Sequence, residues 1–269
     1  MASVTSETIE KLRQQFLDEA TISKPNLYHP VDIERVRTEE WQVKRFLIDN
    51  DNNVDKAFQH LCRSMKWKKE FGIHEMNDET FPIEFYHVNG VELTGRSKAG
   101  AYLQWEVLRN QCNFKELTIW YKRFIACQLE KLDRMANENG FITITDATGS
   151  GVSNVDMEIT RFKLDIIENY PAALKGIWMI DIPWLMGSVM KIVVSMMSPK
   201  VKAVVKYFKA AELSQEIDSV YISTSLKGMR DKSDFPCGPK LMCDIYKTMQ
   251  LDDQFVDKYY KAVKIPRPH

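Results

Sequence analysis

A Gly-Ser-Gly turn at residues 149–151 is the strongest candidate for a nucleotide-binding loop in this sequence. It follows a predicted strand and leads into a predicted helix, as a dinucleotide-binding loop does. The third glycine of that motif is replaced by Asn154, and Glu168 falls within a predicted helix rather than at the end of a second strand. The sequence therefore favours an ordinary turn, in which Asp146 hydrogen-bonds the local backbone.

Other residues that carry enzyme chemistry do not have the spacing that such chemistry needs. No Gly-x-Ser-x-Gly motif is present, so the nucleophile of an α/β-hydrolase has no position. Arg134 follows Cys127 at the wrong spacing for a phosphatase loop, so we expect Cys127 in the core. His60 and Cys62 do not have the spacing of a metal pair. We therefore expect no enzyme activity, no metal and no cofactor.

The cysteines and the charge balance restrict the compartment and the partners. The five cysteines form no CxxC pair, which favours a reducing compartment over a disulfide framework or a zinc site; they are Cys62, Cys112, Cys127, Cys237 and Cys243. There are 37 basic and 37 acidic residues, so the formal net charge is zero. Because most nucleic-acid binders depend on a net positive charge, we expect no nucleic-acid partner.

No stretch of the sequence reaches the roughly 18 to 20 apolar residues that span a bilayer. Residues 184–197 come nearest, but they are too few and include Lys191. The first 20 residues are too charged for a signal peptide. The sequence predicts a cytoplasmic protein.

The N-terminal third has the apolar spacing of helices. Ile9, Leu12 and Phe16 predict a short amphipathic helix, and residues 31–71 predict a second helical region with a break at residues 49–53. These segments indicate a small all-helical subdomain.

Beyond Pro82, short β-prone runs alternate with helices. We predict strands at residues 101–108, 141–145 and 177–182, with a further strand at 220–222. The helices between them begin at Asn113, in a capping box with Glu116, and after Ser153; a closing helix spans residues 251–263. This alternation predicts the α/β class with a mainly parallel sheet.

Residues 184–208 combine two different helical patterns. The first is rich in methionine and valine, which suits an irregular apolar ligand. The second begins at Ser198 and Pro199, and at helical spacing it has an apolar side opposite three lysines. Such a basic amphipathic helix either lies on an anionic membrane or packs on the core with its lysines solvated.

Several motifs between residues 31 and 231 resemble the CRAL-TRIO (Sec14-like) lipid-binding family. They are Arg-Phe-Leu at 45–47, Val-Asp-Lys-Ala at 54–57, Trp-Lys-Lys-Glu at 67–70, the strand ending at Asp146 with Gly149 behind it, Tyr-Pro at 170–171 and Ile-Asp-Ile-Pro-Trp at 180–184. Family members often carry basic residues where Ile-Asp-Asn-Asp stands at 48–51, and Gly-Gly where Lys-Gly stands at 227–228. Contacts to a phosphoinositide headgroup are therefore not carried over.

The resemblance implies an α/β domain whose helices enclose an apolar pocket, preceded by the helical subdomain. We expect the divisions 1–30, 31–78, 79–235 and 236–269 for the N-terminal helix and linker, the helical subdomain, the lipid-binding domain and a helical tail. Within the family, the sequence is most similar to a protein that has a further domain and a membrane anchor, so we expect a fragment or a shorter relative.

The function that the resemblance implies is non-enzymatic binding and exchange of one small hydrophobic lipid, with residues 184–208 as a mobile gate at the membrane surface. The ligand is a phospholipid, a sterol, a tocopherol or a retinoid, and the location is cytoplasmic with peripheral association to intracellular membranes such as the endoplasmic reticulum. A protein-interaction scaffold with the same fold is the alternative.

The candidate residues fall into two sets. The predicted lipid-binding residues are Trp105, Phe124, Ile144, Phe162, Ile180, Met186, Met190, Val193, Val194, Met197, Val201, Val204 and Phe208. The predicted membrane contacts are Lys202, Lys206 and Lys209.

Overall fold

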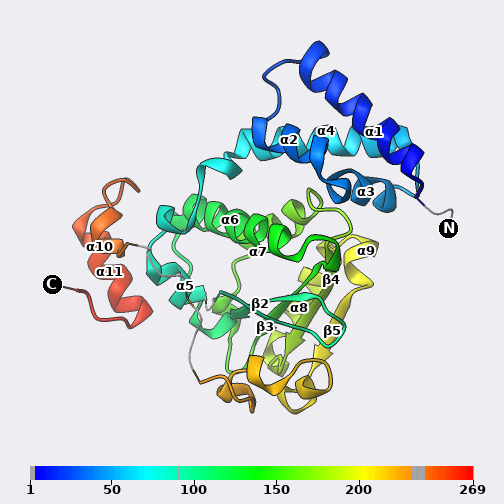
Figure 1. Ribbon diagram of the computed structural model, residues 1–269. Helices are drawn as coiled ribbons and strands as arrows, with labels where there is room; N and C mark the ends of the chain where they lie inside the picture. The colour runs from blue at the N-terminus through cyan, green and yellow to red at the C-terminus, as the bar shows by residue number, and fades with distance from the viewer. Residues whose placement is uncertain (1–3, 90, 232–234, 236–239, 269) are drawn as a thin grey trace.

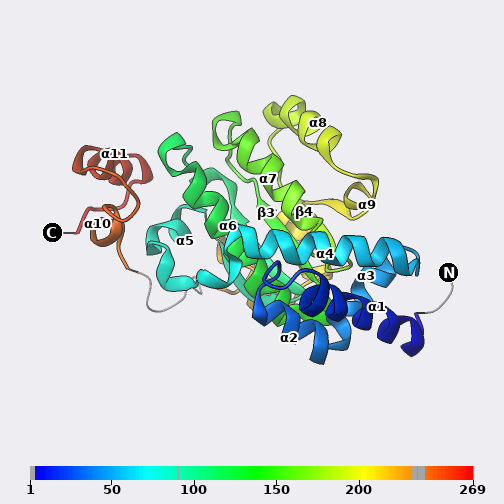
Figure 2. The same ribbon diagram turned by 90° about the horizontal axis from the view of Figure 1, so that it is seen from above.

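A computed structural model describes residues 4–89, 91–231, 235 and 240–268. Cys237 and the expected domain boundary at residue 236 lie outside these residues. The helices of the N-terminal part form a layer above α6 and α7, which in turn cover a β-sheet (Figure 1). The last two helices lie at the side of this assembly, next to α5 (Figures 1 and 2).

Four helices form the N-terminal helical region, and the apolar spacing predicts their helical structure. They are α1 (Ser6–Asp18), α2 (Pro30–Thr38), α3 (Glu40–Asp49) and α4 (Val54–Phe71). The predicted break after α3 is confirmed, because Asp51 and Asn52 adopt positive φ and the Asn53 side chain caps α4. The predicted apolar face of α1 is buried at Ile9 and Leu12.

The sheet contains five strands in the order β1-β2-β3-β4-β5. Their bounds are β1 (Glu92–Arg96), β2 (Tyr102–Val107), β3 (Phe141–Asp146), β4 (Leu174–Ile180) and β5 (Val205–Phe208). Only β1 is antiparallel to its neighbour, so the predicted mainly parallel α/β fold is confirmed.

Helices connect and flank these strands. The connecting helices are α6 (Thr118–Ala136), α7 (Met157–Ile167), α8 (Gly187–Met196) and α9 (Pro199–Lys202), and the flanking ones are α5 (Ile83–Asn89), α10 (Met242–Ile245) and α11 (Asp253–Val263). The predicted closing helix is therefore present as α11. Within the described residues, no helix is both long enough and apolar enough to cross a membrane.

Two local predictions were wrong. The expected strand at residues 220–222 is a 3-10 turn, Ser219–Tyr221. Asn113 does not cap α6, which begins at Thr118; instead its amide nitrogen donates to the carbonyl oxygen of Ser153, 3.0 Å away. At Asn113 a contact to a distant part of the chain replaces the local pattern, whereas the turn at 219–221 is closed by the local hydrogen bond from Tyr221 N–H to the carbonyl oxygen of Asp218.

The predicted basic amphipathic helix was also wrong in its second half. Helix α9 ends at Lys202, and Val205–Phe208 instead adds strand β5 in parallel to β4 at the edge of the sheet. Valine, tyrosine and phenylalanine favour strands. A strand places Val205 and Tyr207 on one face of the sheet and Lys206 and Phe208 on the other.

The two faces of the sheet are covered by different segments. On one face, Trp105, Ile144, Trp178 and Ile180 pack against residues 213–226, which are built of short 3-10 turns. On the other face, β2, β3 and β4 present Gln104, Thr143, Thr145, Ile177 and Met179 toward α6, α7 and α8.

Buried ion pairs attach the helical subdomain to α6. The Arg45 guanidinium binds both carboxylate oxygens of Asp133, at 2.9 and 2.7 Å, and donates to the carbonyl oxygen of Pro171 at 2.9 Å. The Lys68 ammonium lies 2.7 Å from Glu130. Burial alone would raise the pKa of Glu130, but attraction to Lys68 and Arg134 outweighs it and lowers that pKa.

Candidate ligand pocket

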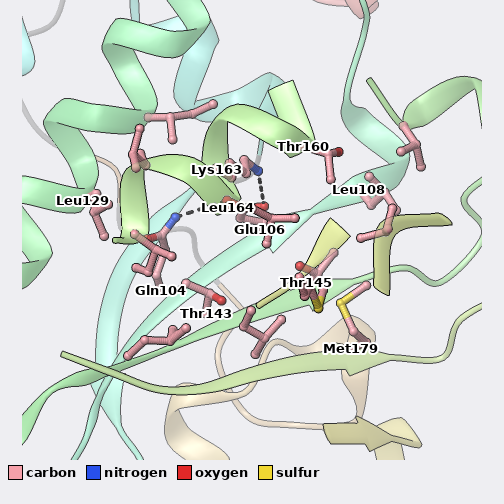
Figure 3. Close-up of a pocket in the computed structure, with 18 of the residues that line it drawn as sticks. Gln104, Glu106, Leu108, Leu129, Thr143, Thr145, Thr160, Lys163, Leu164 and Met179 are labelled. Carbon is pink, nitrogen blue, oxygen red and sulfur yellow. Dashed lines mark hydrogen bonds and ion pairs between the residues drawn. The ribbon is translucent and has the colours of Figure 1, made fainter. Parts of the chain in front are cut away.

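A cavity of about 170 Å³ lies between the sheet and helices α6, α7 and α8. Figure 3 shows side chains from both the strands and the helices that surround it. The apolar part of the lining consists of Leu108, Ile125, Leu129, Val155, Leu164, Ile166, Ile167, Leu174, Ile177, Met179, Met190, Val193 and Met197. These side chains can surround an apolar ligand.

A polar cluster interrupts this apolar lining. The Lys163 ammonium of α7 lies 2.7 Å from Glu106 Oε2, and the Gln104 amide nitrogen lies 3.2 Å from Glu106 Oε1 (Figure 3). Thr143 and Thr145 of β3 contribute hydroxyl groups to the same cavity. The cluster offers donors and acceptors to one polar group of an otherwise apolar ligand.

Helical spacing brings α7 and α8 to the cavity. Thr160, Lys163, Leu164 and Ile167 recur along one face of α7, and Met190, Val193 and Met197 come from α8 and its end. Helix α8 therefore presents methionine and valine side chains toward the cavity.

The opposite surface of the α8 region is apolar as well. The exposed fractions are 86% for Trp184, 61% for Leu185 and 54% for Ile192. Trp184 and Leu185 belong to the 3-10 turn Trp184–Met186, which leads directly into α8. This segment thus places apolar side chains toward the cavity and exposes others, beside Lys191, toward the outside.

The structure places three of the predicted lipid-binding residues, Met190, Val193 and Met197, in the cavity lining. Met186 is buried beside the cavity with Leu108 and Ala147. Val194 and Val201 pack in the cluster that contains Val193. Val204 lines a smaller cavity of about 110 Å³, which also contacts Val201.

Like Met186, Val194, Val201 and Val204, the remaining six predicted lipid-binding residues do not line this cavity. Trp105, Ile144, Ile180 and Phe208 pack on the opposite face of the sheet. Phe124 lies in the core between α5 and α6, and Phe162 stacks on Phe71 with ring centroids 5.6 Å apart.

The sequence prediction missed the polar members of the lining as well as most of the apolar ones. Gln104, Glu106, Thr143 and Thr145 alternate with the apolar residues that were chosen, so the period of two was visible along β2 and β3. Nothing in that alternation shows which face of the sheet carries a cavity. The prediction of lipid-binding residues follows the more apolar face, which packs against residues 213–226.

The three predicted membrane lysines are exposed but do not share a helix face. Lys202 ends α9, whereas Lys206 lies on β5 with its ammonium 5.8 Å from the centre of the Trp178 ring. The Lys209 ammonium lies 3.8 Å from Asp181. Neighbouring Lys200 donates to the carbonyl oxygen of Asp49 at 2.7 Å, which ties α9 to the helical subdomain.

The Gly-Ser-Gly segment forms a turn, as predicted. Asp146 Oδ1 accepts the backbone N–H of Thr148 at 2.9 Å, and Oδ2 pairs with Arg109 at 2.6 Å. Cys127 is buried, and this burial raises the pKa of its thiol to about 12, so it is an inert core residue. In the part of the chain that the structure describes, no three histidine, cysteine or acidic side chains are grouped to hold a metal ion.

Comparison with known proteins agrees with this geometry. Residues 107–228 match the CRAL/TRIO domain. The structure also matches the crystal structure of Sfh5, with a TM-score of 0.65 and 14% sequence identity over 95% of this chain and 100% of that chain. The CRAL-TRIO/Sec14-like fold generally binds lipids, and its members are typically carriers rather than enzymes. Residues 107–228 of this chain are therefore similar to the CRAL/TRIO domain, and the chain shares the fold of Sfh5.

Proposed function

We propose that the chain binds one small hydrophobic lipid in the cavity beneath α8 and exchanges it at a membrane surface without catalysing a reaction. The observation that carries this proposal is the cavity itself, whose apolar walls surround a single polar cluster within a CRAL/TRIO domain. The flexible side chains of Met179, Met190 and Met197 suit a ligand of irregular shape. A phospholipid or another hydrophobic lipid of similar size is the proposed ligand.

Helix α8 is the proposed gate. A cavity of about 170 Å³ is smaller than the roughly 300 to 1,000 Å³ usual for ligand pockets, so one wall must move to admit a whole lipid. Helix α8 is the wall with the most exposed apolar surroundings, at Trp184, Leu185 and Ile192. Movement of this helix opens the cavity on the side where those residues lie.

The same surface is the proposed membrane contact. Tryptophan and leucine side chains partition into the interface between headgroups and acyl chains. Lys202, Lys206 and Lys209 add an attraction of about 1 kcal/mol each toward an anionic leaflet. Opening the gate against lipid spares the ligand a passage through water.

We also propose which protein the chain is related to and where in the cell it is located. Pro-Trp-Leu-Met at residues 183–186 and Lys-Ile-Val at 191–193 resemble the N-terminal domain of motile sperm domain-containing protein 2. We place the protein in the cytoplasm, with peripheral association to intracellular membranes such as the endoplasmic reticulum. Residues 31–78 are the proposed helical subdomain and 79–235 the proposed lipid-binding domain.

Native mass spectrometry before and after organic extraction tests lipid binding. We expect a copurified lipid at near one-to-one stoichiometry. Thr145 points into the cavity from β3, so Thr145→Phe should fill the cavity and abolish loading. The matched control is Ile144→Val on the opposite face of the same strand, which should keep the lipid. If both the natural chain and the control lack lipid, an interaction scaffold replaces the carrier.

A further inference from the structure

A second cavity, of about 280 Å³, lies at the carboxyl ends of β2 and β3. Its lining includes Trp105, Arg109 and Asp146 from these strands and their ends, and Ser223, Ser225 and Arg230 from the segment that covers the opposite face. Ligands of open α/β sheets commonly bind beyond the carboxyl ends of the strands. The second cavity has no role in the proposed gate.

Glu106 belongs to the linings of both cavities. It lines the first cavity, where it contacts Lys163, and it also lines the second. A molecule with one apolar and one polar part can therefore occupy both, with its apolar part beneath α8 and its polar part beyond Glu106.

The charges of the second cavity are balanced in pairs. The Arg109 guanidinium lies 2.6 Å from Asp146, and the Arg230 guanidinium pairs with Glu92. The side chains of Asp146 and Glu92 are only 4% and 8% exposed. A phosphate group would bring a negative charge beside these carboxylates while both arginines are already neutralised, so the cavity disfavours it.

The hydrogen-bonding groups favour hydroxyl-rich chemistry. The hydroxyl oxygens of Ser223 and Ser225 lie 2.9 Å apart, and each hydroxyl can donate and accept. Guanidinium groups add donors, and carboxylates add acceptors. A sugar or another polyol presents the matching mixture of donors and acceptors without a charge.

We propose that the second cavity receives the polar head of the bound lipid, and that this head is uncharged and rich in hydroxyl groups. The inference rests on the proposed function, because the apolar part of the same molecule lies in the first cavity. The lipid class that it names is a glycosylated or polyol-bearing lipid.

Competition binding with matched lipids tests this inference. The probes are diacylglycerol, monogalactosyl diacylglycerol and phosphatidic acid with identical acyl chains. Ser225 is exposed at the second cavity, so Ser225→Trp should block that cavity. Thr224→Trp is the matched control, because Thr224 is an exposed neighbour that does not line the cavity. We expect the natural chain to prefer the galactolipid to both other lipids by at least about tenfold, the size of one hydrogen bond to a charged group.

Ser225→Trp should remove the preference for the galactolipid and change the affinity for diacylglycerol less than about twofold. Thr224→Trp should keep the preference, because Thr224 does not line the second cavity. The inference is overturned if the natural chain prefers phosphatidic acid or shows no preference, or if Ser225→Trp leaves the preference intact. If none of the three lipids binds but native mass spectrometry still finds a copurified lipid, the inference fails and the proposed function stands. If no lipid copurifies either, both fail.

Discussion

Lys163 of α7 and Glu106 of β2 form an ion pair inside the proposed ligand cavity, with 2.7 Å between Nζ and Oε2. The side chain of Glu106 is only 10% exposed, so the contact with Lys163 takes place largely out of water. The pair places a strong donor and a strong acceptor in a lining that is otherwise mainly apolar. We therefore expect it to set which polar group of a lipid the cavity accepts.

Neutralising this pair should reduce the discrimination between polar and apolar ligands. In the double variant Glu106→Gln/Lys163→Met, shape is largely kept while both charges are removed. We expect the preference for a monoacylglycerol over a pure hydrocarbon of equal chain length to fall about tenfold, because a hydrogen bond to a charged group contributes about 1.5 to 3 kcal/mol. Competition against a fluorescent lipid measures the ratio, and an unchanged ratio would show that ligands do not contact the pair.

Removing the exposed apolar side chains beside α8 should weaken membrane binding without destabilising the fold. Trp184→Ser with Leu185→Ser should lower the partition coefficient onto liposomes by at least tenfold, whereas the free energy of unfolding should change by less than about 0.5 kcal/mol because both side chains are exposed. Val220→Ser is the matched control, since Val220 is 55% exposed on the segment that covers the opposite face of the sheet. Equal effects of the control and the double variant would remove α8 as the membrane contact.

Charge reversal of the three proposed membrane lysines should act only on charged membranes. With Lys202, Lys206 and Lys209 changed to Glu, we expect binding to anionic liposomes to fall at least tenfold, since each lysine contributes about 1 kcal/mol there. Binding to neutral liposomes and the circular dichroism spectrum should remain as in the natural chain. Sedimentation with liposomes at two salt concentrations measures the effect, and unaltered anionic binding would refute a role for these lysines.

Glu130 should link stability to pH. Because the pKa of this carboxyl lies below its ordinary value of 4.5 in the folded chain, the ionised form stabilises the fold above about pH 4.5, and this contribution is lost as pH falls below that value. Glu130→Gln should cost roughly 3 to 5 kcal/mol at pH 7, since it leaves Lys68 buried without its charged partner. Denaturant titrations should show the difference between the two proteins shrinking from pH 5 to pH 3. A constant difference would assign the loss to packing.

The element types were largely predictable from the sequence, because their patterns are strong. Helices α1 to α4 carry one buried stripe each, and the turn residues at 49–53 separate α3 from α4 as expected. Strand β5 was not predictable in this way. Its four residues fit the period of a helix as well as that of a strand. They form a strand because α8 and α9 return the chain to the edge of β4.

The site was hard to predict mainly because the sequence does not show which face of the sheet lines the cavity. Strands of a parallel sheet are covered on both sides, so both faces of β3 and β4 carry apolar residues. Ile144 and Thr145 are neighbours in sequence but belong to opposite faces of the sheet. The more apolar of the two, Ile144, lies in the core that packs against residues 213–226 and not in the cavity. The residues of β2 and β3 that line the cavity are instead Gln104, Glu106, Thr143 and Thr145.

Photocrosslinking with a diazirine-bearing lipid tests the central claim most directly, because it reports which residues contact the ligand. After irradiation of the loaded chain, peptide mapping should find the label on Thr145, Met179, Met190 and Val193, which line the cavity. A label concentrated on Ile144, Trp178 and Ile180 of the opposite face, or a chain that takes up no label, would contradict the account.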